Sequence, residues 1–211
     1  MRTRVKICGI TSQRDAAAAC SAGADAIGLV FYSRSPRHVS IELASAIALA
    51  VPPFVSRVAL FKDASTEEVE AVLACVEIDL LQFHGSEDPA YCRSFGRPYI
   101  KALGLKGVAD IAAAIADGER DYAEARALLL DGHAPGEAGG SGESLDWSSL
   151  ARAAKPLILA GGLDPDNVRR AIELARPYAV DVSSGVEASP GIKDAAKLTA
   201  FLREVAAAQS H

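Results

Sequence analysis

The sequence predicts an α/β fold, a single-domain (β/α)8 barrel (TIM barrel) that covers residues 1–211. Three observations predict it. Short runs rich in β-branched and other apolar residues recur along the whole chain, and several lack polar/apolar alternation, as expected of parallel strands buried on both faces. Amphipathic helical patterns separate these runs. Eight such units in 211 residues give a repeat of about 26 residues, which suits a compact barrel.

The expected strands are short and evenly spread along the chain. They are Arg4–Cys8, Ala26–Phe31, Val55–Phe61, Leu80–Phe83, Tyr99–Ala102, Ala127–Asp131, Leu157–Ala160 and Ala179–Val182. An open, doubly wound sheet is the alternative fold, and it would place a ligand crevice at one switch point. Because polar and glycine-rich residues follow many of the strands, we favour a closed ring of loops.

Local signals mark the ends of several helices. Thr11 can cap an alanine-rich helix that ends at Gly23. Ser65 and Glu68 have the spacing of a capping box. Asp164–Pro165 is expected to open another helix, since proline is favoured in the first helical turn.

Composition and charge exclude several classes of function. The net charge is −5 and the pI is about 5.4, which gives no electrostatic footprint for nucleic acid or for an anionic membrane surface. We find no signal peptide and no apolar run of the roughly 18 residues that a membrane span needs, so a cytoplasmic protein is expected. Cys8, Cys20, Cys75 and Cys92 form no CxxC pair and have no histidine at metal-ligand spacing, so no metal site is expected. The sequence does not settle the oligomeric state, and a monomer or weak dimer is expected.

Two glycine-rich turns point to a phosphorylated small-molecule ligand. Gly161 and Gly162 follow the seventh expected strand, and Ser183, Ser184 and Gly185 follow the eighth. Glycine allows backbone N–H groups to approach an anion closely, and barrel enzymes commonly bind phosphate after strands seven and eight. The alternative is that these glycines only form tight turns.

Cys8 and Asp131 are candidates for acid–base chemistry because each ends an expected strand. Cys8 is either a small buried residue or a base whose surroundings lower its pKa. Asp131 follows Leu128–Leu130, and a partly desolvated carboxyl at such a position can act as a proton donor, although a structural ion pair is the alternative. The glycine-rich segment Gly132–Ser144 follows directly, and we interpret it as a loop over the site rather than as a linker.

Other polar side chains also lie at strand ends. Arg37 is either a solvated charge or a group that recognises a carboxylate or phosphate through two hydrogen bonds. His84 is expected to have a positioning or structural role rather than to carry protons, and Asp181 lies next to the end of the eighth expected strand. We expect these three residues to bind substrate. Lys62 and Lys101 are not distinguishable from ordinary rim charges.

Seven motifs in order resemble the phosphoribosylanthranilate isomerase family, and they span the chain from end to end. They are KICGIT at Lys6–Thr11, GLVFYSRSPRHVS at Gly28–Ser40, LQFHG at Leu81–Gly85, LLLDG at Leu128–Gly132, GGSGESLDW at Gly139–Trp147, LAGGLDPDNV at Leu159–Val168 and DVSSGVEASPGIKD at Asp181–Asp194. The resemblance implies an Amadori rearrangement of N-(5-phosphoribosyl)anthranilate in tryptophan biosynthesis, without metal or organic cofactor. It implies that Cys8 is the general base, that Asp131 is the general acid and that Arg37 contacts the anthranilate carboxylate. The turns after strands seven and eight would hold the phosphate.

The chain departs from the family pattern at two positions, where Ser141 replaces threonine and Leu145 replaces phenylalanine. These changes affect only the expected details of loop closure. A related alternative is indole-glycerol-phosphate synthase, which resembles a chain with a long extension before its first strand, whereas three residues precede that strand here. A phosphate-binding barrel without catalysis is the alternative from another class, and the presence of Cys8 and Asp131 argues against it.

Overall fold

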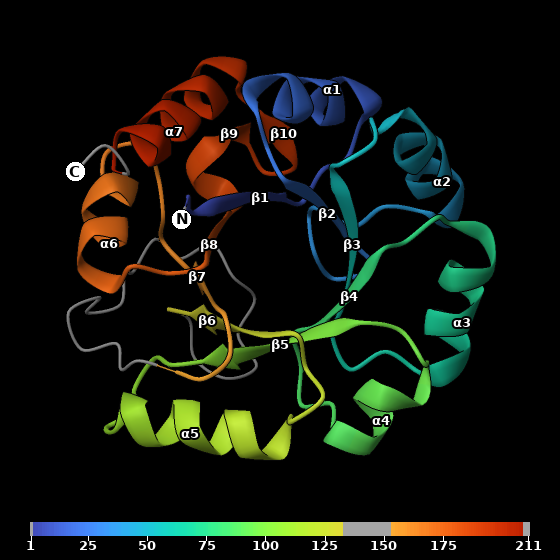
Figure 1. Ribbon diagram of the computed structural model, residues 1–211. Helices are drawn as coiled ribbons and strands as arrows, with labels where there is room; N and C mark the ends of the chain where they lie inside the picture. The colour runs from blue at the N-terminus through green and yellow to red at the C-terminus, as the bar shows by residue number, and fades with distance from the viewer. Residues whose placement is uncertain (1, 133–152, 209–211) are drawn as a thin grey trace.

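Eight parallel strands close into a barrel in their order along the chain (Figure 1). The computed structural model describes residues 2–132 and 153–208. The strands are β1 (Arg4–Cys8), β2 (Ala26–Val30), β3 (Ser56–Phe61), β4 (Leu80–Phe83), β5 (Tyr99–Gly104), β6 (Ala127–Asp131), β7 (Leu157–Ala160) and β8 (Ala179–Val182). Because β8 pairs with β1, the sheet has no open edge. The predicted fold class is therefore confirmed, and the open doubly wound sheet is excluded.

Helices surround the barrel on the outside (Figure 1). They are α1 (Gln13–Ala22), α2 (Ile41–Ala50), α3 (Thr66–Cys75), α4 (Pro89–Ser94), α5 (Ile111–Asp121), α6 (Val168–Ala175) and α7 (Ala195–Ala207). A short 3-10 helix, η2 (Ser184–Val186), and a hairpin of β9 (Glu187–Ser189) and β10 (Ile192–Lys193) follow β8. No described helix is long and apolar enough to cross a membrane.

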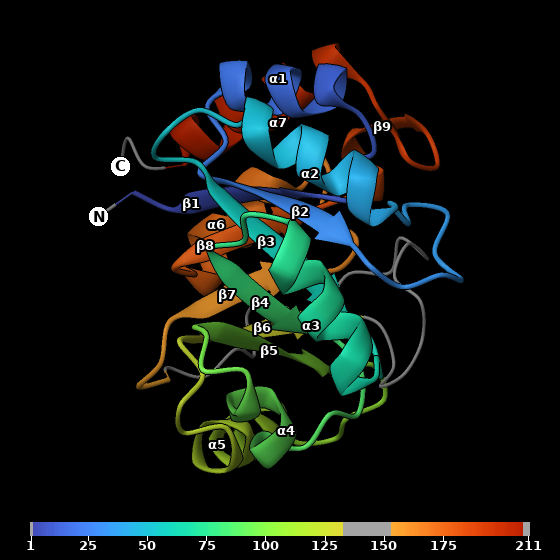
Figure 2. The same ribbon diagram turned by 90° about the vertical axis from the view of Figure 1, so that its right-hand side faces the viewer.

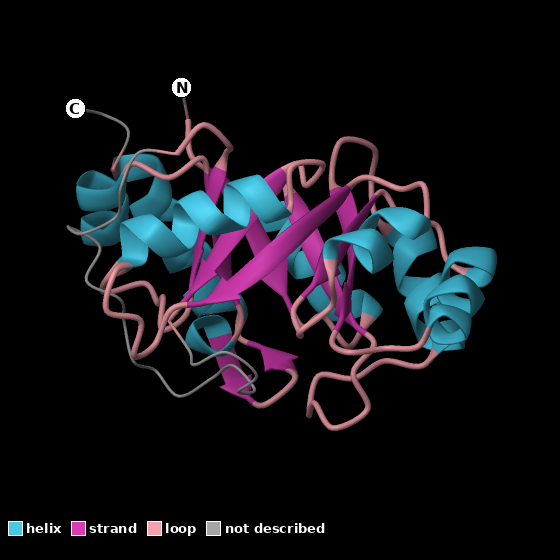
Figure 3. Ribbon diagram, turned by 90° about the horizontal axis from the view of Figure 1, so that it is seen from below, coloured by secondary structure: helices cyan, strands magenta, loops and turns pink. Residues whose placement is uncertain are grey.

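All eight strands point toward the same end of the barrel (Figure 2). Seen from below, the β9–β10 hairpin stands out on the side where the strands end (Figure 3). This end therefore collects the loops that follow the strands, which is where barrel enzymes carry their sites.

The predicted strand limits agree closely with the structure. The largest difference is in β5, which continues to Gly104 because Leu103 and Gly104 still pair with Leu130 and Asp131 of β6. Pairing of this kind depends on the neighbouring strand, so the residue pattern of one strand alone does not reveal it.

Two of the predicted helix starts are wrong, whereas the capping box at Ser65 and the helix end at Gly23 are confirmed. Ser12 rather than Thr11 caps α1, because the hydroxyl of Thr11 donates instead to the carbonyl of Gly191. Helix α6 begins at Val168, because the carboxylate of Asp164 accepts from the backbone N–H groups of Asp166 and Asn167 and forms a turn before the helix.

Each strand is buried on both of its faces. Successive residues therefore alternate between contacts with the outer helices and contacts inside the barrel. In β6, Leu128 and Leu130 pack outward with Ile115 of α5, whereas Leu129 packs inside the barrel with residues of the adjacent strands. In β1, Val5 and Ile7 belong to the core shared with the helices, and Cys8 lines the pocket at the barrel's end. This period of two brings Lys6 and Cys8 to the inner face of β1.

Candidate active site

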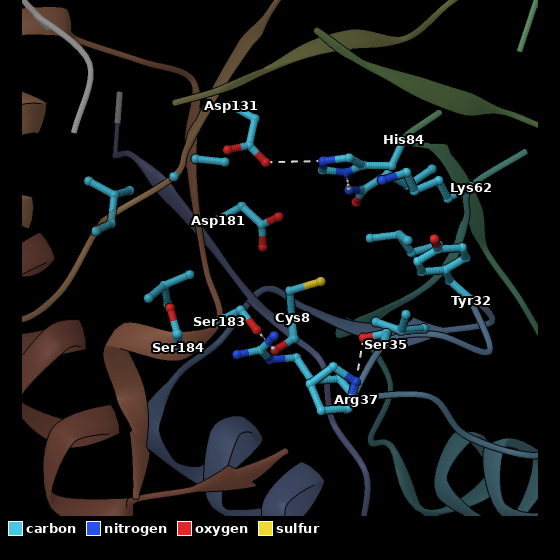
Figure 4. Close-up of a pocket in the computed structure, with 18 of the residues that line it drawn as sticks. Cys8, Tyr32, Ser35, Arg37, Lys62, His84, Asp131, Asp181, Ser183 and Ser184 are labelled. Atoms are coloured by element: carbon cyan, nitrogen blue, oxygen red, sulfur yellow. Dashed lines mark hydrogen bonds and ion pairs between the residues drawn. The ribbon is translucent and has the colours of Figure 1, made fainter. Parts of the chain in front are cut away.

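One pocket at the carboxyl end of the barrel brings together most of the predicted site residues. Figure 4 shows Asp131, Asp181, Cys8 and Arg37 along one side and His84, Lys62 and Tyr32 along the other. The predicted residues that line it are Cys8, Arg37, Lys62, His84, Asp131, Gly161, Gly162, Asp181, Ser183 and Ser184. Side chains from β1, β4, β6 and β8 thus converge, although they are far apart in the sequence.

Cys8 ends β1, lines the pocket and is 7% exposed, so its side chain is largely shielded from solvent. Burial raises the pKa of the Cys8 thiol, and Lys6 is the strongest opposing influence. The lowered pKa that the alternative of a base requires is not found among the described residues, since desolvation disfavours the charged thiolate more than nearby cations favour it.

Asp131 is connected to a chain of hydrogen bonds that starts inside the barrel. Nε2 of His84 lies 3.0 Å from Oδ2 of Asp131, and Nδ1 of His84 lies 3.0 Å from Nε2 of Gln82. With the Gln82 amide as donor, Nδ1 accepts and Nε2 carries the proton that it donates to Asp131. Gln82 is fully buried, so it fixes the orientation of the ring. This geometry fits the positioning role predicted for His84.

Arg37 is not a solvated charge, because its guanidinium donates to both carboxylate oxygens of Glu187, each at 2.8 Å. Nζ of Lys193 lies 2.7 Å from the same carboxylate. Burial raises the pKa of Glu187, but Arg37 and Lys193 outweigh it and the pKa is lowered. Two cations therefore share one anion, and this side of the pocket is locally positive on an acidic protein.

The turn after β7 packs closely against the turns after β6 and β8. Gly161 and Gly162 have φ values of 81° and 66°, a region that favours glycine. A Cβ at Gly161 would lie 2.4 Å from the backbone nitrogen of Gly132, and one at Gly185 would lie 2.0 Å from the carbonyl oxygen of Leu163. Gly185 does not line the pocket but packs against Leu163 in the turn after β7, and its predicted role in binding phosphate stays a prediction.

The structure distinguishes the places of Lys62 and Lys101, which the sequence alone did not distinguish. Lys62 lines the pocket, with its Nζ 5.2 Å from the centre of the Tyr32 ring. Lys101 is 3% exposed and forms an ion pair of 3.0 Å with Glu87, away from the pocket lining. Lys101 is therefore a buried structural charge rather than a rim charge.

Some predictions fall outside the described residues. These are the segment after Gly132 that was interpreted as a loop over the site, and the departures at Ser141 and Leu145. Within the described ranges, no group of three or more His, Cys, Asp or Glu side chains could hold a metal ion. Cys20, Cys75 and Cys92 lie in α1, α3 and α4, and all four cysteines are free thiols.

A closed parallel barrel with a pocket that is lined by ionisable side chains at the ends of its strands defines a (β/α)8-barrel enzyme. Residues 5–204 match the family model of N-(5'phosphoribosyl)anthranilate (PRA) isomerase. A curated N-(5'-phosphoribosyl)anthranilate isomerase of Pseudomonas putida is 55% identical over 203 residues, which are 96% of this chain and 97% of the relative. The chain belongs to the N-(5'-phosphoribosyl)anthranilate isomerase family.

Solved structures agree with this assignment. Phosphoribosyl anthranilate isomerase from Thermotoga maritima is 41% identical, with a TM-score of 0.85 over 97% of this chain and 99% of that chain. Another solved phosphoribosyl anthranilate isomerase, 38% identical with a TM-score of 0.81 and the same coverage of both chains, is in complex with reduced 1-(o-carboxyphenylamino)-1-deoxyribulose 5-phosphate.

Proposed function

We propose that this chain converts N-(5'-phosphoribosyl)anthranilate to 1-(2-carboxyphenylamino)-1-deoxyribulose 5-phosphate in tryptophan biosynthesis, with Cys8 as general base and Asp131 as general acid. The observation that carries this proposal is that a thiol and a carboxyl group, each at the end of a strand, line one pocket. The assignment to the isomerase family and the phosphorylated compound bound by a relative support the same reaction.

The proposed chemistry moves protons and electron pairs within the substrate. Asp131 donates a proton to the ribose ring oxygen, the bond between that oxygen and C1′ breaks, and an iminium forms. The iminium makes the proton on C2′ acidic, and the Cys8 thiolate removes it. The electron pair of the C2′–H bond forms the C1′=C2′ bond of an enol-amine. Loss of the proton on O2′ and gain of a proton at C1′ then give the ketone.

The pocket also offers a place for each end of this substrate. The turns at Gly161–Gly162 and Ser183–Ser184 would receive the phosphate through backbone N–H groups. The positive side at Arg37 would receive the anthranilate carboxylate, although Glu187 already occupies the guanidinium's Nε and Nη2. Asp181 would accept from a ribose hydroxyl, because its buried Oδ1 has no hydrogen-bond partner among the described residues.

Replacing Arg37 with methionine is expected to raise KM about 10- to 100-fold and to change kcat much less. A charge-assisted hydrogen bond to the substrate carboxylate contributes roughly 1.5–3 kcal/mol, and this contribution is made to substrate and transition state alike. Steady-state kinetics measure both constants. Arg34→Met is the matched control, because Arg34 is exposed in the same loop and does not line the pocket. Equal effects of the two variants would contradict the assigned role.

The activity itself has a direct test. Anthranilate-type fluorescence of the substrate should disappear when the purified protein is added, since the rearrangement changes the substituent on the anthranilate nitrogen. If the fluorescence persists while the phosphorylated ligand still binds, the chain is a binding module without catalysis and the proposal fails.

The expectations of a monomer or weak dimer and of a cytoplasmic location remain part of this proposal. Four free thiols, one of them required as a base, suit a reducing compartment. Leu49 and Phe54 are exposed apolar side chains, at 70% and 104%, and they are available for weak self-association.

A further inference from the structure

A buried ion pair lies next to Cys8, and its lysine has no role in the chemistry described so far. Lys6 and Asp181 are paired residues in the register of β1 and β8, and Nζ of Lys6 lies 2.8 Å from Oδ2 of Asp181. Their side chains are 6% and 7% exposed. A buried pair of this kind is a weak contributor to stability, because the cost of removing both charges from water offsets their attraction. Its position therefore calls for a functional explanation.

Lys6 and Cys8 share the same space inside the barrel. They are two residues apart on β1 and face inward together. A Cβ at Gly28 of β2 would lie 2.8 Å from the sulfur of Cys8 and 3.1 Å from Cε of Lys6. The absence of a side chain at Gly28 thus leaves room for both groups, and the ammonium of Lys6 is held beside the thiol.

We propose that Lys6 is a positioning residue for the base, and that its ammonium, anchored by Asp181, stabilises the Cys8 thiolate. This inference rests on the proposed function, in which Cys8 removes the C2′ proton. Lys6 itself does not line the pocket, whereas Cys8 and Asp181 do, so the proposed effect of Lys6 on the substrate acts through Cys8.

The charged groups around Cys8 come from several elements. Lys6 lies on β1, Asp181 on β8, Arg37 in the loop after β2, and Lys193 on β10. Lys6 and Lys193 favour the thiolate and Asp181 opposes it, and among these charges Lys6 has the largest effect. Across the pocket, His84 and Asp131 act on Asp181.

Lys6 keeps its own charge while Cys8 titrates. Burial lowers the pKa of the Lys6 ammonium, but Asp181 and the Cys8 thiolate outweigh this effect and the pKa is raised. The two members of the pair therefore act on Cys8 with opposite signs. Loss of Lys6 should raise the pH at which the thiol ionises, and loss of the Asp181 charge should lower it.

The test is the rate at which iodoacetamide alkylates Cys8 as a function of pH in the full-length protein, followed on the Cys8 peptide by mass spectrometry. Lys6→Met should raise the midpoint of this profile by at least about 1 pH unit, a tenfold slower reaction at a fixed pH below the midpoint. Asp181→Asn should lower the midpoint. Lys6→Arg, which restores the cation, should return the midpoint toward the wild-type value.

Lys101→Met is the matched control, because it also removes a buried, ion-paired lysine but leaves the surroundings of Cys8 intact. Its midpoint should equal that of the wild type. Unchanged midpoints in Lys6→Met and Asp181→Asn, or shifts in the same direction, would overturn the proposal. If Lys6→Met does not fold, the test rests on Asp181→Asn alone. An alkylation midpoint in Asp181→Asn that equals or exceeds the wild-type midpoint then overturns the proposal.

Alkylation does not require turnover, so this test is independent of the proposed function. If Cys8→Ser kept its turnover while the alkylation midpoints shifted as expected, Cys8 would not be the base, and the effect of Lys6 on its ionisation would still stand.

Discussion

Cys8→Ser is expected to lower kcat by about 10³-fold while the fold and phosphate binding remain intact. General base catalysis contributes typically 10²–10⁴-fold, and a serine hydroxyl at this position does not ionise in the pH range in which a thiol does. Serine is close to cysteine in size, so the pocket keeps its shape. The measurement is the rate of substrate fluorescence loss at saturating substrate, together with circular dichroism and competition by inorganic phosphate.

A second cysteine provides the control for this variant. Cys75 is exposed at the end of α3, so Cys75→Ser should have the wild-type kcat. A near-wild-type kcat in Cys8→Ser would remove Cys8 from the mechanism, whatever its place in the pocket.

Asp131→Asn is the second change with a large expected effect, a fall in kcat of about 10²- to 10⁴-fold. An amide cannot donate a proton to the ring oxygen in the way that a carboxylic acid can, so ring opening is slowed. Asparagine keeps the size of the side chain, and its amide oxygen can still accept from Nε2 of His84, which lies 3.0 Å from the carboxylate. Kinetics and ligand binding should therefore separate, with kcat reduced and phosphate competition retained.

Asp117→Asn is the matched control, since Asp117 lies on the exposed face of α5 and pairs only with Arg120 among the described residues. It should leave kcat unchanged. Comparable rates for wild type and Asp131→Asn would show that another group delivers the proton.

The sequence predicts the barrel well because its information is local. Leu128–Leu130 forms a continuous apolar run, and such a run fits a strand that is buried on both faces. The error in the predicted start of α1 occurs where a residue far away in the sequence determines the hydrogen bonds. The hydroxyl of Thr11 donates to the carbonyl of Gly191, 180 residues away, so Ser12 caps the helix instead.

The candidate site was predictable to the extent that strand ends reveal it. Cys8 and Asp131 end strands, Asp181 is the next-to-last residue of β8, and the pocket brings the three together. Lys6 was missed, although its spacing of two from Cys8 on one strand places both on the same face. Glu187 and Lys193 gave no signal, because only the β9–β10 hairpin brings them to Arg37.

Gln82 and the direction of the Cys8 pKa were also beyond the sequence. The amide acts through His84, and its effect depends on a ring orientation that only the folded chain defines. The pKa of Cys8 depends on the balance between burial and the charges of Lys6, Asp181 and Lys193, which come from three different strands. Neither the orientation of the His84 ring nor the balance that sets the Cys8 pKa follows from residue type or spacing.

The proposed mechanism needs one proton shared between two groups. The reactive form has a thiolate at Cys8 and a protonated Asp131, and it carries the same net charge as the form with both protonation states reversed. The rate therefore does not follow either ionisation alone. It should be level between the two apparent pKa values of the pair and should fall outside them.

The pH dependence of kcat/KM for the wild-type enzyme tests this pair most directly, because it reports the ionisations of the free enzyme. We predict that kcat/KM falls on both the acid and the alkaline side, and that one of the two midpoints coincides with the midpoint of Cys8 alkylation. A profile that stays flat or keeps rising on either side, or that has no midpoint at the ionisation of Cys8, would contradict the assignment of Cys8 and Asp131 as base and acid.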